Sequence, residues 1–285
     1  MVASELTRSS AGLVAHTTSP FALFRSAWTN RHIILQLSRR DIVGRYRGSI
    51  LGLFWSLFHP LLMLAVYTFV FGVVFKARWT GGDPTSRLDF ALILFTGMIM
   101  YAVFAECVNR APTAILSYPN FVKKVVFPLE VMPWVLLCSA LFHAVVSLAV
   151  LLVVYFLTNW HLHWTVLLLP VVMLPLVTLC LGIMWFLCSL GVFVRDVGQA
   201  TSVITAALMF LSPLFYPSAA LPERYQILMR LNPMTFPIEQ AREVLLWGKL
   251  PDWPELAIYT ACSLIVMWLG FVWFQRSRSG FADVV

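Results

Sequence analysis

The stretch LGLFWSLFHPLLMLAVYTFVFGVVF, residues 51–75, contains no formally charged side chain. A helix needs roughly 20 consecutive apolar residues to cross the hydrocarbon core of a bilayer, so this stretch is long enough to span a membrane. Five more apolar stretches follow it along the chain. The sequence therefore predicts an all-α membrane protein with six transmembrane helices. The predicted spans are roughly 51–75, 90–109, 131–157, 164–193, 199–216 and 255–274.

The composition agrees with a membrane location. Of the 285 residues, 60% are hydrophobic and 12% are charged, whereas a soluble domain carries about 25% charged residues. The net charge is +7, but the arginines flank the predicted spans and form no nucleic-acid-binding motif, so no nucleic-acid partner is expected. The five cysteines lie in or beside apolar stretches without a CxxC pair, so neither disulfides nor a metal site is expected.

Positively charged residues in the connecting segments predict the orientation. With the N-terminus in the cytosol, 13 of the 20 Lys and Arg residues lie on the cytosolic side and 7 on the outer side. Connections rich in Lys and Arg stay in the cytosol during insertion. The sequence therefore predicts a multi-pass protein with both termini in the cytosol.

The N-terminal part is predicted to be a flexible tail, residues 1–20, followed by a basic amphipathic helix, residues 21–48. Apolar side chains recur close to the 3.6-residue period of one helix face. Such a helix lies in the plane of the membrane interface. Its arginines form either an electrostatic anchor on anionic lipid or a platform for a cytosolic partner, and the sequence leaves both open. The recurring residues are Phe24, Trp28, Leu35, Ile42 and Tyr46.

Three glycines recur every four residues where this helix would meet the membrane domain, residues 49–285. They are Gly44, Gly48 and Gly52. Small residues at this spacing permit close approach between helices. A flexible elbow between the interfacial helix and the first span is the alternative, and it is the favoured interpretation.

Two connections differ from ordinary loops. Residues 110–130 are more apolar than a solvated cytosolic loop requires, so we expect them to pack against another surface. Residues 213–254 hold seven of the sixteen prolines and two short amphipathic runs, ERYQILMRL and IEQAREVLLW. Each run is too short to span, which makes them candidates for re-entrant or interfacial helices on the outer side.

Few residues could perform chemistry within the spans. The chain has no GxxxxGK[ST] phosphate-binding loop, so another polypeptide must bind ATP if transport consumes it. Ionisable residues inside a membrane are functional candidates by default, and here they are His59, Glu106, His143 and Glu130. For the histidines, an imidazole satisfied within the protein interior is the favoured interpretation. We expect no catalytic, cofactor or metal site in this chain.

Aromatic side chains near the ends of the first and fifth spans are candidates for lining a transport path. Their faces can stack on sugar rings while offering few fixed hydrogen bonds, which suits a polymer that must slide. Packing against lipid is the alternative, and for any single residue it is the better supported one. The candidates are Trp55, Phe58, Phe210, Phe215 and Tyr216.

Three ordered segments resemble the type-2 ABC exporter permeases, and within them most closely the exporters of O-antigen, teichoic acid and capsular polysaccharide. RDIVGRYRGSILGLFWSLFHPLLMLAVYTFVFGVVF, residues 40–75, resembles the family's first-span signature. SYPNFVKKVVFPLEVMP, residues 117–133, resembles the connection between the second and third spans. LSPLFYPSAALPERYQILMRLNPMTFPIEQAREVLLWG, residues 211–248, resembles the outer segment before the last span.

The resemblance implies a homodimer in the bacterial cytoplasmic (inner) membrane, joined to two separate ATPase subunits that bind ATP and magnesium. The implied cargo is a polysaccharide linked to undecaprenyl diphosphate, with O-antigen favoured over capsule and teichoic acid. The residues implied to contact the ATPase are Phe121, Lys123, Lys124, Arg39 and Arg40. The residues implied to form the outer gate are Pro217, Pro222, Tyr225, Pro233, Pro237 and Glu239.

Other functions fit the sequence less well. A type-2 permease for a drug or a lipid has the same architecture, and only the quoted segments argue against it. An ion-coupled carrier needs carboxylates in the middle of the membrane, which are scarce here. An intramembrane acyl- or glycosyltransferase needs a cluster of polar catalytic groups, which the sequence does not contain.

Overall fold

A computed structural model describes residues 20–75, 87–117, 127–218 and 222–284. Within these ranges every regular element is a helix, so the predicted all-α class is confirmed. Five helical segments in the described part are long and apolar enough to cross a bilayer. They are Gly52–Val74, Phe90–Thr113, Leu129–Asn159, Trp164–Phe193 and Trp253–Gly280.

The helices run in sequence with short irregular segments between them. Their bounds are α1 Pro20–Thr29, α2 Arg31–Tyr46, α3 Trp55–Tyr67, α4 Arg87–Arg110, α6 Met132–Asn159, α7 Leu169–Phe193, α8 Val197–Leu211, α9 Glu223–Leu231, α10 Thr235–Leu245, α11 Trp253–Ser277 and α12 Phe281–Val284. A π-helical turn, η2 (Thr68–Val74), continues α3. Short 3-10 turns are Gly52–Phe54, Ala111–Thr113, Leu129–Val131, Trp164–Leu168 and Arg278–Gly280.

The fifth predicted span, 199–216, is shorter than expected. Helix α8 ends at Leu211, and its 15 residues extend about 22 Å at a rise of 1.5 Å per residue. Pro213 explains the early end, because a residue that precedes proline is driven out of the helical conformation. Ser212 accordingly has an extended backbone, with ψ of 154°. The structure therefore has five helices of spanning length and one shorter apolar helix among the described residues.

The single amphipathic helix predicted for residues 21–48 is wrong in detail, because the structure divides it at Asn30 into α1 and α2. The break changes the phase of the apolar pattern. Trp28 and Leu35 are 72% and 63% exposed, whereas Ile34 is buried against Val131 and Val135 at the start of α6. Of the predicted apolar face, Trp28 and Leu35 therefore do not pack on the bundle, whereas Tyr46 contacts His143 of α6.

The connection between α2 and α3 is an elbow. Helix α2 ends at Tyr46, and Gly48 and Gly52 have positive φ angles of 87° and 50°. Glycine adopts these angles without the steric penalty that a Cβ imposes. No heavy atom lies within 4 Å of the position of an added Cβ at Gly44, Gly48 or Gly52, so these glycines do not serve close helix packing within the subunit.

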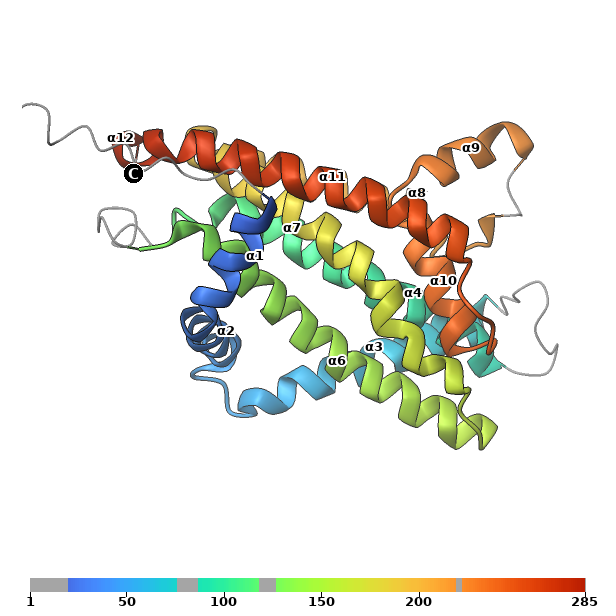
Figure 1. Ribbon diagram of the computed structural model, residues 1–285. Helices are drawn as coiled ribbons and strands as arrows, with labels where there is room; N and C mark the ends of the chain where they lie inside the picture. The colour runs from blue at the N-terminus through green and yellow to red at the C-terminus, as the bar shows by residue number, and fades with distance from the viewer. Residues whose placement is uncertain (1–19, 76–86, 118–126, 219–221, 285) are drawn as a thin grey trace, which may run out of the picture.

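The long helices form one bundle whose two ends carry different elements. Figure 1 shows α1, α2 and α12 at one end of the bundle and α9 and α10 at the other. Of the segments of spanning length, Phe90–Thr113 is the most buried and Gly52–Val74 the least. Helix α4 is therefore the central helix, and α3 lies at the periphery.

Helices α7 and α11 approach each other most closely at two glycines. A Cβ added to Gly270 would lie 2.0 Å from the carbonyl oxygen of Gly182, and one added to Gly182 would lie 2.5 Å from the carbonyl oxygen of Val266. Such distances leave no room for a side chain. Small residues at helix crossings allow this backbone contact inside membranes.

Candidate functional site

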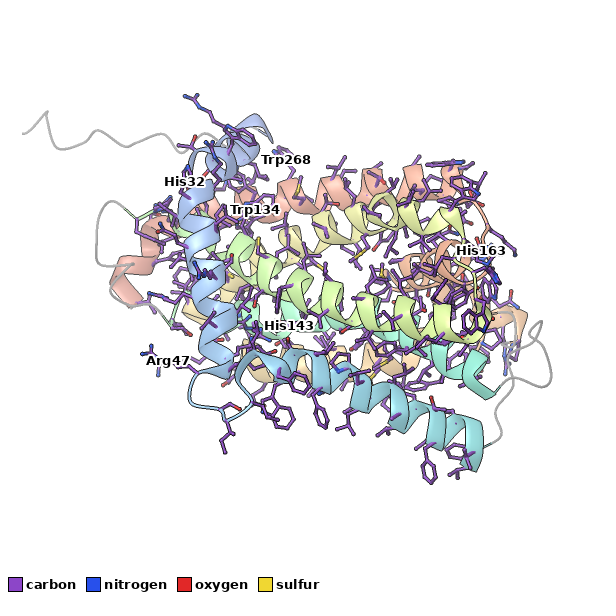
Figure 2. All side chains as sticks on the ribbon, turned by 90° about the horizontal axis from the view of Figure 1, so that it is seen from below. His32, Arg47, Trp134, His143, His163 and Trp268 are labelled. Atoms are coloured by element: carbon purple, nitrogen blue, oxygen red, sulfur yellow. The ribbon has the colours of Figure 1, made fainter. Side chains whose placement is uncertain are left out.

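Charged and polar side chains from α2, α4 and α6 meet just before the elbow. Helix α2 contributes Asp41, Arg45 and Tyr46, helix α4 contributes Glu106 and Arg110, and helix α6 contributes His143. Figure 2 places His143 where the end of α2 and the start of α3 meet α6. We call these six residues the junction cluster.

The contacts of the junction cluster join all three helices. Glu106 forms ion pairs with Arg45 and, at 3.4 Å, with Arg110, and Arg110 also reaches Asp41 at 2.6 Å. His143 Nδ1 lies 3.1 Å from a Glu106 oxygen, and Nε2 lies 3.1 Å from the Tyr46 hydroxyl. His143 Nδ1 also lies 3.3 Å from an Arg45 nitrogen, so it faces both the carboxylate and the guanidinium. The two imidazole nitrogens thus both have partners.

Asp41 lies outside the spans, at the cytosolic end in the predicted orientation. Burial alone would raise its pKa, but the hydrogen bond and the charge of Arg110 outweigh burial, and the pKa of Asp41 is lowered. The carboxylate therefore stays ionised through the neutral range. An opposite charge at hydrogen-bonding distance has this effect on an acid.

A cavity of about 390 Å³ lies beside the junction cluster. It is bounded by α2, α3, α4 and α6, and it combines polar groups with one indole ring. Its polar and aromatic lining residues are Arg45, Tyr46, Trp55, Ser56, His59, Glu106, His143 and Ser147. Its apolar lining residues are Pro60, Ile99, Ala102, Val103, Ala140 and Ala144.

The five aromatic candidates fall into two groups at opposite ends of α3 and η2. Trp55 and Phe58 are 40% and 37% exposed and contact each other edge to face, with ring centroids 5.4 Å apart. The second group is built on Phe71 of η2, and residues 55 and 71 are about 24 Å apart along a helix. Phe215 lies 5.9 Å from Phe71 and 5.8 Å from Phe210, centroid to centroid.

Tyr216 belongs to the second group through its hydroxyl, which donates to the carbonyl of Phe210 at 2.8 Å. Phe210 is 62% exposed, and Phe215 and Tyr216 are partly buried. The structure thus brings together three of the five candidates, and Trp55 and Phe58 form a separate pair.

A buried arginine that the sequence analysis did not single out fixes the end of the bundle that carries α9 and α10. Arg242 on α10 is only 1% exposed. Its guanidinium donates to the carbonyls of Ile93 at 3.0 Å, Pro213 at 2.6 Å and Leu214 at 3.1 Å. Burial lowers its pKa to about 10, so it is still protonated at neutral pH. It therefore ties α10 to α4 and to the segment that follows α8.

Two neighbouring residues support this arrangement. A Cβ added to Gly97 on α4 would lie 2.8 Å from an Arg242 nitrogen, so the glycine leaves space for the guanidinium. Asn232, between α9 and α10, donates to the carbonyl of Leu211 at 2.9 Å and accepts from the Met234 amide at 2.9 Å. The turn between the short helices is thus anchored on the end of α8.

The predicted gate residues lie around this anchor. Pro222 precedes α9, and Tyr225 on α9 is exposed, with the Arg224 guanidinium 4.6 Å from its ring centroid. The Pro233 carbonyl accepts a hydrogen bond from Tyr259 of α11 at 2.8 Å. The remaining three are Pro217, which is partly buried after α8, Pro237, which is buried in α10, and Glu239, which is partly buried in α10.

Glu239 lies one turn before Arg242 on α10. Burial raises the pKa of its carboxyl above the ordinary value, although the positive charge of Arg242 acts in the opposite direction. Helix α10, which the family resemblance assigns to the outer gate, thus carries an acidic and a basic side chain one turn apart.

Of the residues implied to contact an ATPase, Arg39 and Arg40 are exposed on α2. Phe121, Lys123 and Lys124 lie outside the described residues. Glu130, at the start of the third span, pairs with Arg278 at 2.7 Å and accepts from Ser26 at 3.1 Å. This contact connects α1, the start of α6 and the end of α11 at the end of the bundle that carries α2.

The model of the family described as ABC-2 type transporter matches residues 33–246 of this chain. The match extends from α2 through α10 and covers well over half of the sequence. The chain belongs to the ABC-2 type transporter family. Membership and the five helices of spanning length together identify a multi-pass membrane protein.

Relatives of this ABC-2 type transporter match along most of their length. The O-antigen export system permease protein RfbA of Myxococcus xanthus is 27% identical over 265 residues, which are 92% of this chain and 99% of the relative. An RfbA protein of Klebsiella pneumoniae is 23% identical over 89% of this chain and 95% of its own. The polysialic acid transport protein KpsM of Escherichia coli is 21% identical over 83% and 90%, respectively.

Proposed function

We propose that the chain is the membrane subunit of an ATP-driven exporter that moves undecaprenyl-diphosphate-linked polysaccharide, O-antigen in particular, across the bacterial inner membrane. The observation that carries the proposal is the match to an O-antigen export permease over 92% of this chain and 99% of the relative. A match of that extent includes both ends of the bundle and both short outer helices. Capsular polysaccharide is the second candidate cargo, supported by the match to KpsM.

A separate ATPase subunit supplies the energy, because the sequence has no phosphate-binding loop of its own. ATP and magnesium bind to that subunit. Its contact surface on this chain includes Arg39 and Arg40 of α2 together with Phe121, Lys123 and Lys124. Exposed basic side chains on one interfacial helix suit an acidic partner surface.

The transporting unit is a homodimer with both termini of each subunit in the cytosol. The exposed aromatic side chains of α3 and α8 line the path at the interface between the two copies. The support for this arrangement is their placement, since α3 is the least buried segment of spanning length and carries one aromatic group near each end. The Arg242 anchor and the short helices α9 and α10 form the outer gate.

Deleting the gene and analysing the lipid-linked glycans tests the proposed function. An intact glycan on undecaprenyl diphosphate should accumulate in the cytosolic leaflet, and its surface form should disappear. Unchanged surface glycan in the deletion strain would contradict the proposal. Co-purification with an ATPase from the native membrane tests the energy source independently.

Charge reversal tests the coupling surface. The double variant Lys123→Glu and Lys124→Glu should lose ATPase association or uncouple hydrolysis from export. A matched control reverses Arg224 and Arg230 on α9, at the other end of the bundle, and should keep ATPase association. Wild-type association and export in the first variant would argue against this surface.

A further inference from the structure

The cavity beside the junction cluster has polar groups that the cluster does not use. His59 and Ser147 line it, and neither hydrogen-bonds to another described residue. His59 is exposed and Ser147 is partly buried on the cavity wall. Both side chains are therefore accessible to a ligand that has hydrogen-bonding groups of its own.

The charges on and beside the cavity wall indicate whether the ligand is an anion or an uncharged molecule. The junction cluster contains two arginines, Arg45 and Arg110, and two carboxylates, Asp41 and Glu106, which pair with one another. The positive charges are thus already neutralised at short range. An anion would have to compete with Glu106 for Arg45, so the site offers little net attraction to a phosphate group.

An uncharged, hydroxyl-rich ligand fits the lining better. Trp55 presents an indole ring to the cavity, and such rings combine a large apolar face with a polar edge. Around it, hydroxyl and imidazole groups can both donate and accept hydrogen bonds. This combination of one aromatic face and several mixed donors and acceptors suits a sugar ring.

The volume of the cavity fits one sugar unit. A cavity of about 150 Å³ holds one benzene ring, or about 25 Å³ for each non-hydrogen atom. At that ratio the 390 Å³ cavity holds about 16 such atoms. A hexose unit of a polymer has about 11, so the cavity has room for one unit.

We propose that this cavity binds one uncharged sugar unit of the transported glycan, with Trp55 under the ring and His59 and Ser147 bonded to hydroxyl groups. The proposal rests on the proposed function, because it assigns a binding site to the polysaccharide. In the predicted orientation the site lies at the cytosolic end of the path, next to α2. A single site of this kind would grip the polymer at the start of its path through the membrane.

Photo-crosslinking in living cells tests the proposal with the cell's own glycan as the probe. A benzophenone amino acid replaces Ser147 or, in a second strain, His59, and the cells are labelled with radioactive glucose and with ³²P-phosphate. The matched control position is Val153, which is exposed on the same helix as Ser147 but does not line the cavity. Illumination should attach glucose label to the permease at positions 147 and 59 and not at 153.

A second variant tests the role of the ring. Trp55→Leu should lower the crosslinking yield at position 147 about fivefold, the factor that corresponds to about 1 kcal/mol. Trp273→Leu on α11 is its control, since Trp273 is 47% exposed, close to the 40% of Trp55, and does not line the cavity. Export in the Trp273→Leu strain should be normal.

Several outcomes would overturn the proposal. They are an absence of glucose label at both cavity positions while export continues, equal label at position 153, and adducts that carry ³²P without sugar. The deletion strain separates this failure from failure of the proposed function. If the strain accumulates lipid-linked glycan but the cavity positions give no adduct, only the sugar site is wrong.

Discussion

Replacing Arg242 should release the end of the bundle that carries α10. The side chain is 1% exposed and donates three hydrogen bonds to the carbonyls of Ile93, Pro213 and Leu214. Methionine at this position keeps most of the volume and removes every donor. In Arg242→Met, three buried carbonyl oxygens lose a charged donor in a region with little access to water.

The size of the effect follows from two opposing contributions. Hydrogen bonds to a charged group contribute about 1.5–3 kcal/mol each, so three of them amount to roughly 4.5–9 kcal/mol. Burying the guanidinium costs several kcal/mol, which methionine no longer incurs. We therefore expect Arg242→Met to lower the free energy of unfolding by about 3 kcal/mol, near the lower end of the range for breaking buried charged contacts.

The assay is denaturant titration of the purified protein in detergent micelles, with loss of helical circular dichroism as the signal. Arg230→Met on the exposed helix α9 is the control, and it should unfold at the wild-type midpoint. Arg242→Lys should lie between the two, because an ammonium group is a point charge that cannot reproduce the planar fork of donors. A wild-type midpoint for Arg242→Met would refute the reasoning that this arginine anchors α10.

Three further predictions address other parts of the molecule. Gly270→Leu should prevent α7 and α11 from packing, because even a Cβ at position 270 would lie 2.0 Å from the Gly182 carbonyl oxygen. The measurement is the yield of monodisperse protein. Gly198→Ala is the control and should leave the yield unchanged, because nothing lies within 4 Å of its added Cβ. The pKa of Asp41 is lowered beside Arg110. The ionised carboxylate therefore contributes fully to stability above its ordinary pKa near 3.8, and this contribution is lost as the pH falls through the lowered pKa. Asp41→Asn should remove that part of the pH dependence of the free energy of unfolding in acid. The purified chain without its partner should release phosphate from ATP at background rate, and robust turnover from a verified single-component sample would contradict the separate ATPase.

The sequence predicts the helices well because bilayer thickness dictates the length of an apolar run. The error in the fifth span has a local cause, since the apolar pattern continues to Tyr216 but Pro213 ends the helix before it. The error near the N-terminus has a similar cause. The apolar residues keep their helical spacing across Asn30, but the helix breaks there into α1 and α2. The residues expected to form one apolar face therefore belong to two helices.

The junction cluster could be predicted only in part. Glu106 and His143 were candidates as ionisable residues inside spans, but their partners on α2 are about 60 and 100 residues away in sequence. Arg242 could not be predicted as an anchor, because its partners are backbone carbonyls and its burial depends on how α10 folds back. The sequence shows only that it lies three residues after Glu239 in an amphipathic run.

Helix α4 connects the two ends of the molecule. Near its start, the carbonyl of Ile93 accepts from Arg242 of α10, and near its end Glu106 pairs with Arg45 of α2. Thirteen residues of unbroken helix separate the two contacts, or about 20 Å. An α-helix transmits axial displacement because each turn is hydrogen-bonded to the next. A shift of α2 relative to α10 must therefore either move α4 or break one of these contacts. In the proposed exporter, movement at the end of the bundle that carries α2 and movement at the end that carries α10 are consequently coupled through α4.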